Sequence, residues 1–415
     1  MAGGVVSASG EGTDPADPAR GRVGVLVGLC ACVVLCMTTW FSAAAVLPQL
    51  RLLWRLSDAL AAWLTISVQL GFVAGALLAA LTGLPDRVPP RRLIALASLG
   101  AAAANLGLLV APGAGVALVL RGLTGLLMAG IYPPALKLVA TWFVRGRGVA
   151  LGSVIGALTL GSALPHLVNA AGGLPWQGVI AATSLATLAG GAGVALFVRE
   201  GPYPFPRTAF APALLGQALL NRAVLLATAG YLGHMWELYA MWAWMLSWVR
   251  ARLGAGGEGT ASLLTFLVIA AGAPACLAAG WLADRAGRTA TTIGLMAASG
   301  ACAALAGLAF AAPLPVFLLV GLVWGATVIA DSAQFSAMVT EAGDPRFVGT
   351  ALTAQLGLGF ALTAVTIQLV PLAADRLGGW QWAFLVLVPG PALGVLAVAF
   401  LRGLPEARRI AGGAR

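Results

Sequence analysis

Long apolar runs alternate with short polar connections along most of this chain. Twelve runs can be placed, at about 23–47, 60–82, 93–111, 114–135, 148–170, 177–198, 222–249, 260–283, 289–311, 313–338, 347–371 and 380–402. A helix needs about 20 apolar residues to cross the hydrocarbon core of a bilayer. Because backbone groups in lipid must be bonded within their own helix, the pattern predicts an all-α integral membrane protein with 12 transmembrane helices.

The composition excludes a soluble globular protein. The chain is 60% hydrophobic and 9% charged, with a mean hydropathy of +0.94, whereas a soluble domain carries about 25% charged residues. The 55 glycines suit a membrane bundle, because small residues let helix backbones approach closely. The five cysteines all lie in apolar runs, so we expect small core residues there rather than disulfides or metal ligands.

The basic residues are distributed as membrane topology requires. Eighteen of the 24 Lys and Arg residues lie in connections on one side of the predicted membrane, five lie on the other side, and Arg121 alone lies within a run. Basic residues gather in cytoplasmic loops, so this bias predicts a multi-pass protein of the cell membrane with both termini in the cytoplasm. The sequence lacks the long polar segments of a nucleic-acid-binding face, so nucleic acid is not an expected partner.

Two charged turns occupy matching places in the two halves of the chain. The later one reads Gly280-Trp281-Leu282-Ala283-Asp284-Arg285-Ala286-Gly287-Arg288. The earlier one covers residues 83–92 and reads GLPDRVPPRR. In both, an apolar run ends, an Asp-Arg pair follows, and further Arg residues precede the next run.

These turns resemble the hallmark loop of the major facilitator superfamily of transporters, Gly-x-Leu-Ala-Asp-Arg-x-Gly-Arg, which follows the second and eighth helices. The later turn matches almost fully, at Gly280, Asp284, Arg285, Gly287 and Arg288. The earlier turn keeps Gly83, Asp86 and Arg87, but it is one residue shorter before the Asp and has Pro89 in place of the second glycine. The resemblance covers roughly residues 23–402 and implies two six-helix pseudo-repeats related by an axis along the membrane normal.

The predicted organisation has five parts. A disordered cytoplasmic tail (1–20) precedes an N-terminal six-helix bundle (21–198), a central cytoplasmic linker (199–221), a C-terminal six-helix bundle (222–402) and a cytoplasmic tail (403–415). The first tail is not expected to be a signal peptide, because no basic start leads directly into a short apolar core. Four prolines between positions 202 and 212 disfavour a helix in the linker.

The resemblance implies that the two turns are gating loop motifs. An Asp at a helix end can lie against the N-terminus of an opposing helix, where backbone N–H groups and the helix dipole favour negative charge. Arg285 and Arg288 would then bond carbonyls and carboxylates at the inner end of the bundle. Rocking of the two halves would break these contacts and open the inside.

Charged side chains inside the runs are few, and each costs roughly 2.5–3.5 kcal/mol at mid-bilayer. Arg121, Glu237 and Asp331 should therefore face protein or a wet cavity. Arg121, which shares a helical face with Tyr132, could bind an anionic substrate or pair with a moving acid, and it resembles a widespread coupling Arg of the superfamily's fourth helix. A fixed hydrogen bond to helix carbonyls is the alternative.

A second group of polar residues lies in the seventh run. Glu237 and His234 are three residues apart and so share a helix face. Burial disfavours a charged carboxylate and a neighbouring base can take its proton, so the pair could carry a proton. A protonated Glu237 bonded to a neighbouring helix is the alternative. Trp236 could line the same path, whereas Trp244 and Trp248 are expected in the outer interfacial belt.

Two further runs add candidates. Asp331, which shares a face with Trp324, is either a second proton site or a contact of the cytoplasmic gate. A polar stripe in the fifth run ends in His166 and Asn169, which would face the cavity or lie at its outer rim. The predicted substrate and proton pathway therefore consists of Arg121, Tyr132, His166, Asn169, His234, Trp236, Glu237, Trp324 and Asp331.

Signatures of catalysis are missing from the sequence. Lys137 is the only lysine and follows no glycine-rich phosphate loop, and two histidines do not make a metal motif. We therefore predict neither an enzyme nor an ATP-driven pump, and no cofactor or metal.

The combined prediction is a monomeric secondary active transporter that moves a small solute by alternating access, with protons as the second partner. Its compact loops and Arg121 faintly resemble small-anion permeases of the cyanate and nitrate kind. A proton-driven exporter of drugs or metabolites is the alternative. The sequence does not predict the substrate, the direction of transport or the coupling ion.

Overall fold

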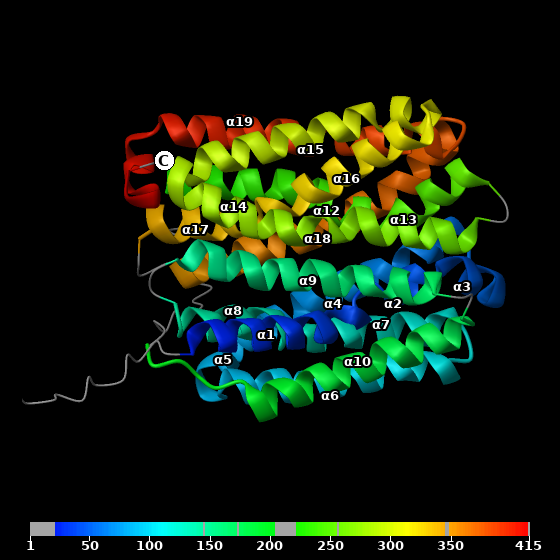
Figure 1. Cartoon of the computed structure of the whole chain (residues 1–415), viewed down its shortest axis with the longest axis horizontal. Coiled ribbons are helices and arrows are strands. Elements are labelled where there is room, and N and C mark those ends of the chain that lie inside the picture. The colour runs from blue at the N-terminus through cyan, green and yellow to red at the C-terminus, as the bar shows by residue number, and fades with distance from the viewer. Residues whose placement is uncertain are drawn as a thin grey trace, which may run out of the picture.

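The computed structural model describes residues 21–143, 146–171, 174–203, 221–254, 257–344 and 348–413. Within these ranges every regular element is a helix, and the long helices run side by side along the longest axis of the molecule (Figure 1). The predicted N-terminal tail and residues 204–220 of the predicted linker lie outside the described residues.

The helices of the first half precede residue 200 and form one side of the molecule in Figure 1. They are α1 (Arg22–Cys36), η1 (Met37–Thr39), α2 (Ser42–Ala45), α3 (Leu47–Trp54), α4 (Asp58–Thr82), α5 (Leu84–Arg87), α6 (Pro90–Leu106), η2 (Gly107–Val110), α7 (Ala114–Met128), α8 (Tyr132–Ala140), α9 (Arg147–Ala170) and α10 (Trp176–Phe197).

The helices of the second half follow residue 220 and form the opposite side. They are α12 (Arg222–Leu253), α13 (Glu258–Ala270), α14 (Gly272–Ala286), α15 (Arg288–Ala311), α16 (Leu314–Ala330), α17 (Ser332–Ala342), α18 (Val348–Arg376), η4 (Trp380–Leu387), α19 (Pro389–Gly403) and η5 (Pro405–Gly413).

The all-helical membrane fold predicted from the sequence is confirmed. In the described part of the chain, 11 helical segments are long and apolar enough to cross a membrane. They correspond to all the predicted runs except 222–249, which lies within α12. With 32 residues, α12 is about 48 Å long and runs beside the others. Its Trp, Tyr, His and Glu residues lower its hydropathy, and all of them except Trp236 are buried. By its length and position, α12 is the candidate for the twelfth crossing.

Several predicted runs are interrupted rather than continuous. The first run was expected to reach residue 47, but its helix ends at Thr39 and the chain continues through the short helices α2 and α3. The fourth run breaks between α7 and α8, just before Pro133 and Pro134, which lack backbone N–H groups. The tenth run breaks between α16 and α17, at Asp331. The length of the apolar runs therefore predicted where the membrane spans lie, but not where the helices within them break.

The two halves meet along two groups of helices. In one group α4 packs against α18, and in the other α9 packs against both α13 and α14. Glycines let α9 and α14 cross closely: a Cβ added at Gly152 would lie 2.5 Å from the carbonyl oxygen of Cys276, and one added at Gly280 would lie 2.6 Å from that of Gly148. Small residues at a crossing let helix backbones touch, so this interface depends on them.

Two tryptophans of α12 do not lie in the interfacial belt that was predicted for them. Trp244 and Trp248 are fully buried rather than part of an interfacial belt. The Trp244 indole donates a hydrogen bond to the carbonyl of Ile367 at 2.7 Å, and Trp248 stacks on Phe317 with ring centroids 4.4 Å apart. The belt prediction is wrong because α12 is covered by α13, α18 and α19 and does not face lipid.

Candidate functional site

A cavity of about 630 Å³ lies between the two halves. It is lined by α4, α5, α8 and α9 of the first half and by α12, α16, α17 and α18 of the second. The lining extends from Tyr239 and Phe360, midway along their helices, to Gly83, Arg87 and Lys137 at the end that carries the charged turns. The cavity thus has the central position that alternating access requires of a solute site.

The cavity wall is largely apolar, with hydroxyl and amide groups set into it. Arg87 and Lys137 are its only charged residues among those described, and no Asp or Glu lines it. Its uncharged polar residues are Thr82, Tyr132, Tyr231, Tyr239, Ser332, Ser336, Thr353 and Gln355. Of the predicted pathway residues, only Tyr132 lines the cavity.

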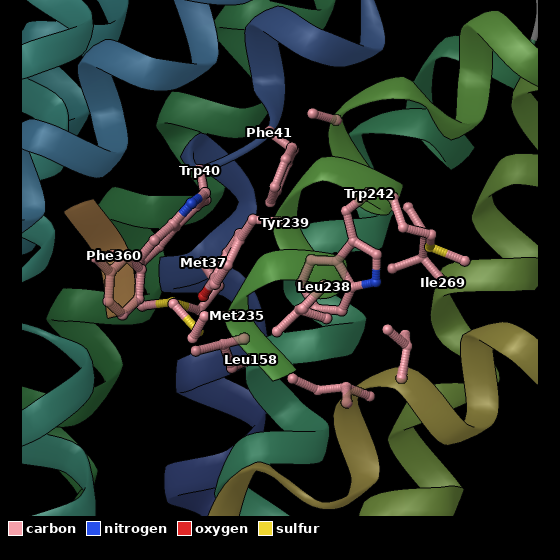
Figure 2. Close-up of a cluster of buried hydrophobic side chains, with 14 of the residues drawn as sticks. Met37, Trp40, Phe41, Leu158, Met235, Leu238, Tyr239, Trp242, Ile269 and Phe360 are labelled. Carbon is pink, nitrogen blue, oxygen red and sulfur yellow. The ribbon is translucent and has the colours of Figure 1, made fainter. Parts of the chain in front are cut away.

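An aromatic cluster joins the two halves, and two of its members, Tyr239 and Phe360, line the cavity (Figure 2). Trp40 from the first half stacks on Tyr239 from the second, with centroids 5.9 Å apart and ring planes at 20°. Phe72 from α4 meets Phe360 from α18 at 4.5 Å. Aromatic pairs add about 0.5–1.5 kcal/mol each beyond their burial, so the cluster holds the two halves together beyond the cavity.

A polar contact also joins the halves beyond the aromatic cluster. Asn169 of α9 donates to Ser262 Oγ of α13 at 2.8 Å and to the carbonyl of Ala45 at 3.1 Å. His166, one turn earlier on α9, is buried, and neither ring nitrogen has a hydrogen-bond partner in the structure. Neither side chain lines the cavity in this conformation, so their place in the pathway stays a prediction.

Arg121 is buried within the first half, and all three nitrogens of its guanidinium donate hydrogen bonds. Its Nη1 donates to the carbonyl of Thr39 at 2.9 Å, to Asn105 Oδ1 at 3.1 Å and to Ser42 Oγ at 3.3 Å. Its Nη2 donates to the carbonyl of Trp40, and its Nε to a carbonyl of α4. The guanidinium therefore satisfies carbonyls that the broken first helix leaves without helical partners. It does not line the cavity, and a role in coupling stays a prediction.

His234 pairs with Asp331 rather than directly with Glu237. His234 Nδ1 lies 2.8 Å from Asp331 Oδ1, and His234 Nε2 lies 2.8 Å from Ser332 Oγ. The break between α16 and α17 places Asp331 and Ser332 against α12. His234 and Asp331 are buried, whereas Ser332 lines the cavity.

Glu237 lies in the wall of the second half, one turn along α12 from His234. Its carboxylate accepts a hydrogen bond from Trp324 Nε1 at 2.7 Å and another from the Ser299 hydroxyl. Trp236 turns away from the cavity, and its indole donates to the carbonyl of Val386 at 2.9 Å. Glu237 and Trp324 thus form one cluster behind the cavity wall, and Trp236 does not belong to it.

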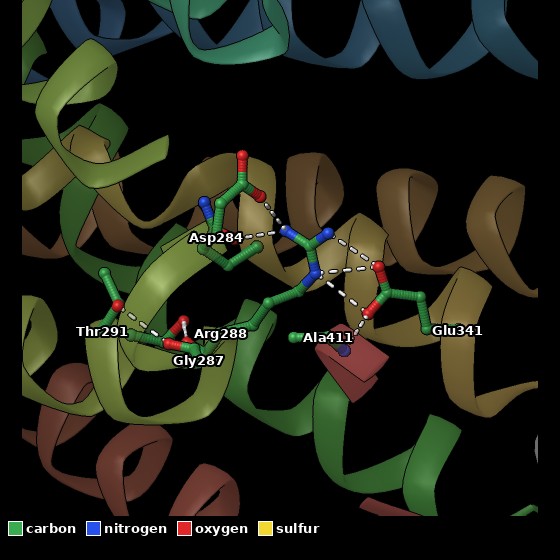
Figure 3. Close-up of polar contacts among 8 residues, drawn as sticks. Asp284, Gly287, Arg288, Thr291, Glu341 and Ala411 are labelled. Carbon is green, nitrogen blue, oxygen red and sulfur yellow. Dashed lines mark hydrogen bonds and ion pairs between the residues drawn. The ribbon is translucent and has the colours of Figure 1, made fainter. Parts of the chain in front are cut away.

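The later charged turn is built around Arg288 (Figure 3). Its guanidinium bonds both carboxylate oxygens of Glu341, with Nε at 2.9 Å from each and Nη2 at 2.7 Å from Oε1. Its Nη1 donates to Gln334 Oε1 at 3.1 Å. Glu341 also accepts from the backbone N–H of Ala411 at 2.8 Å. Arg288 therefore ties α15 to α17 and η5 within the second half.

Within the later charged turn, Asp284 is the residue that contacts the other half. A Cβ added at Gly148 would lie 2.6 Å from Asp284 Oδ1, so the carboxylate lies at the N-terminal turn of α9. Gly287 has φ 94° and separates α14 from α15, a conformation that glycine adopts without strain. The Arg285 guanidinium lies 4.1 Å from the Trp281 ring centroid.

The earlier charged turn is only partly described. Gly83 has φ 61° and ends α4, and Gly83 and Arg87 both line the cavity. The side chain of Asp86 lies outside the described residues.

Comparison with known proteins places this geometry in a family. The model of the Major Facilitator Superfamily matches residues 29–365, well over half of the chain. The chain belongs to the major facilitator superfamily. Its members are transporters rather than enzymes, and this chain is therefore a multi-pass membrane transporter. A search of curated proteins finds no matching sequence.

Solved structures show the same fold. A bacterial homolog of the human lysosomal transporter Spinster, inward-facing and unoccupied, superposes with a TM-score of 0.68 at 14% identity, covering 94% of this chain and 98% of that one. The inward-facing occupied structure of that homolog gives 0.68, at 14% identity over 96% and 99%. The proton:xylose symporter XylE, bound to 6-bromo-6-deoxy-D-glucose, gives 0.71 at 13% identity over 94% and 96%. Nothing in these matches points to the cyanate and nitrate branch.

Sequence reasoning missed several residues that the structure places at the site. Tyr231, Tyr239 and Phe360 line the cavity, and Ser332 connects it to His234. Ser332 follows Asp331 directly, but its role depends on the helix break, for which the sequence has no proline signal. The aromatic cluster could not be foreseen because its members come from both halves.

Proposed function

We propose that this protein is a proton-coupled secondary transporter of a small organic anion that works by alternating access. The observation that carries the proposal is the cavity between the halves, which reaches the charged-turn end and is closed at its other end by the aromatic cluster. Opening that closure while the two halves close around the charged-turn end of the cavity would present the same cavity to the other side.

The chemistry of the cavity wall supports an organic anion. Arg87 and Lys137 are cations at the charged-turn end, and no described lining residue is acidic. A lipophilic cation would have no carboxylate to bind there, which counts against a cation exporter. The apolar wall and tyrosine hydroxyls suit a solute with an apolar body and an acidic group.

Buried acids behind the wall support coupling to protons. Glu237 and Asp331 lie in the second half, out of direct contact with the cavity. A buried carboxyl group that is not held by a fixed cation can exist neutral or charged, which a proton carrier needs. The similar fold of XylE, a proton:xylose symporter, is consistent with such coupling.

The basic residues support an orientation. The charged-turn end carries Arg87, Lys137, Arg285 and Arg288 and would face the cytoplasm under the positive-inside tendency. The cavity would then be inward-facing, the state described for the Spinster homolog. We place the protein in the cell membrane, as a monomer with both termini in the cytoplasm and with the halves at 21–198 and 222–402 as its moving units.

Counterflow in proteoliposomes tests the proposal. Vesicles preloaded with an excess of one unlabelled compound receive a trace of the same labelled compound, over a panel of aryl and alkyl carboxylates, nitrate, sugars and quaternary ammonium ions. We expect transient accumulation for at least one organic carboxylate and none for the ammonium ions, with protein-free vesicles as the control. Counterflow of ammonium ions alone would favour the exporter alternative and contradict the proposed substrate class.

A further inference from the structure

Three side chains form a path of close polar contacts from the cavity into the wall of the second half: a hydrogen bond between Ser332 and His234, and an ion pair between His234 and Asp331. Ser332 lines the cavity, and its Oγ lies 2.8 Å from His234 Nε2. The other ring nitrogen, Nδ1, lies 2.8 Å from Asp331 Oδ1. Because His234 and Asp331 are buried, Ser332 is the member of this path that meets the cavity.

The protonation chemistry of the three groups sets the direction of the bonds. The Asp331 carboxylate lies 2.8 Å from His234 Nδ1, and its negative charge favours the tautomer that carries the hydrogen on Nδ1. Nε2 of the neutral ring is then the acceptor, and the Ser332 hydroxyl is the donor. A hydroxyl both donates and accepts, so it can pass a proton in either direction. Hydrolases use the same order of serine, histidine and aspartate to move a proton.

We propose that Ser332 is the proton entry point of the coupling site and exchanges protons between the cavity and the His234–Asp331 pair. The inference rests on the proposed function and adds the residue that links the solute cavity to protonation. In the loading step, Ser332 Oγ accepts a proton from a hydronium ion in the cavity and gives its own to His234 Nε2. Water and an imidazolium are formed, so one positive charge moves from the cavity to the ring.

This arrangement also couples protonation to the solute. The imidazolium is paired with the charge of Asp331 and donates its Nε2–H to Ser332 Oγ, so the charged ring is stabilised on both sides. A solute oxygen that accepts the Ser332 hydrogen would withdraw that hydrogen from His234. Solute binding at this hydroxyl therefore favours the protonated ring, as a symporter requires.

Other titratable side chains lie near His234, but they do not form hydrogen bonds with its ring nitrogens. Among the described residues, only Ser332 and Asp331 lie within hydrogen-bond distance of the imidazole nitrogens of His234. The neighbouring titratable groups on the packed elements are Glu237 and Tyr231 on α12, Tyr132 on α8 and Cys276 on α14. None of these offers a shorter route from the cavity to the ring.

Nitrogen NMR of the two histidines tests the proposal, because His166 and His234 are the only ones in the chain. The full-length protein in lipid nanodiscs, labelled with ¹⁵N-histidine, is titrated with acid in the absence of any solute. In the wild type we expect rapid proton exchange and one averaged His234 resonance. In Ser332→Ala the exchange should slow by on the order of 100-fold, so that neutral and charged rings give separate resonances.

Matched variants separate proton transfer from a structural effect. Ser336 lines the same cavity one turn along α17, so Ser336→Ala should exchange as the wild type does. Ser332→Thr keeps a hydroxyl and should restore rapid exchange. The His166 resonance reports folding in each spectrum, and Ser332→Gly is a second variant without the hydroxyl.

Rapid exchange in both Ser332→Ala and Ser332→Gly would overturn the proposal. A shifted His234 resonance with an unchanged rate of proton exchange would mean that Ser332 has only a structural role. That result would also overturn the proposal. These measurements use no transported solute, so they are independent of counterflow. Normal counterflow together with rapid exchange in both variants would support the proposed transporter function and contradict the role of Ser332 as proton entry point.

Discussion

At the scale of single residues, the rare buried charges serve different purposes. Arg121 has five hydrogen bonds to carbonyls and polar side chains of its own half, which is the pattern of a structural anchor. Glu237 accepts hydrogen bonds from two neutral donors and forms no ion pair with a cation among the described residues. A buried carboxyl group without a fixed cation can change its protonation state far more easily than a buried guanidinium can.

Replacing Glu237 with Gln should uncouple transport from protons. Gln has the same shape and keeps an acceptor for Trp324, but it cannot carry a proton. With a solute identified by counterflow and an acidic outside, the wild type should accumulate it up to about tenfold per pH unit for one proton, and the variant should only equilibrate it. Uptake in proteoliposomes with an imposed pH gradient measures this.

The control for that variant is Glu258→Gln. Glu258 is an exposed acid paired with Arg250 at 2.7 Å, far from the cavity lining, so accumulation should be unchanged. Undiminished pH-driven accumulation in Glu237→Gln would show that proton coupling does not require Glu237.

Replacing Arg121 with Met should destabilise the first half. In this buried site the carbonyl of Trp40 would lose its Arg121 donor, and that of Thr39 would keep only the Ser42 hydroxyl. Hydrogen bonds to a charged group contribute about 1.5–3 kcal/mol each. We expect a loss of about 3 kcal/mol or more, seen as a lower apparent melting temperature in detergent. Arg92→Gln, at an exposed position, should change stability by no more than about 0.5 kcal/mol. Equal melting of both variants would contradict the anchor role.

At the scale of elements, the helix breaks and the glycine crossing decide the site. The α16–α17 break brings Asp331 and Ser332 to His234, and the end of the first helix at Thr39 leaves the carbonyls that Arg121 binds. The sequence correctly predicted the long helices, because apolar length is a local property. It did not predict where they break, because a break is stabilised by partners on other helices.

Enlarging Gly152 should disturb the crossing of α9 and α14. A Cβ there would lie 2.5 Å from the carbonyl oxygen of Cys276, closer than side chains tolerate, so Gly152→Val should cost about 1–3 kcal/mol. The apparent melting temperature and counterflow rate should both fall. Gly294→Ala on α15, where a Cβ meets nothing within 4 Å, should be neutral or stabilising by up to about 1 kcal/mol. An unaffected Gly152→Val would mean that the crossing is not tight.

At the scale of the whole molecule, the two halves meet in an aromatic cluster (Figures 1 and 2), and a cavity of about 630 Å³ lies between them. The charged turns lie at one end, where Asp284 reaches α9 of the opposite half while Arg288 stays within its own. These two charged residues of the turn therefore make different contacts: Asp284 contacts α9 of the other half, and Arg288 ties α15 to Glu341 of α17 within its own half.

Membrane topology can be tested by thiol labelling in a background without the five native cysteines. Asp375→Cys, at the end of α18, should react with a membrane-impermeant maleimide on intact cells. Arg409→Cys, in η5, should react only after permeabilisation, because the positive-inside tendency places that end in the cytoplasm. The reverse pattern would invert the proposed orientation and make the cavity outward-facing.

The sequence alone determined the membrane class, the number of crossings and, through the two charged turns, the family, because apolar length, charge placement and a short motif are all local features. It also singled out Glu237, His234 and Asp331, since a charge in lipid is too costly to be incidental. Only the tertiary structure decided which of these groups meet, that Arg121 binds carbonyls, and that Ser332 alone of the path faces the cavity. Those contacts join helices far apart in the chain, and no local pattern encodes them.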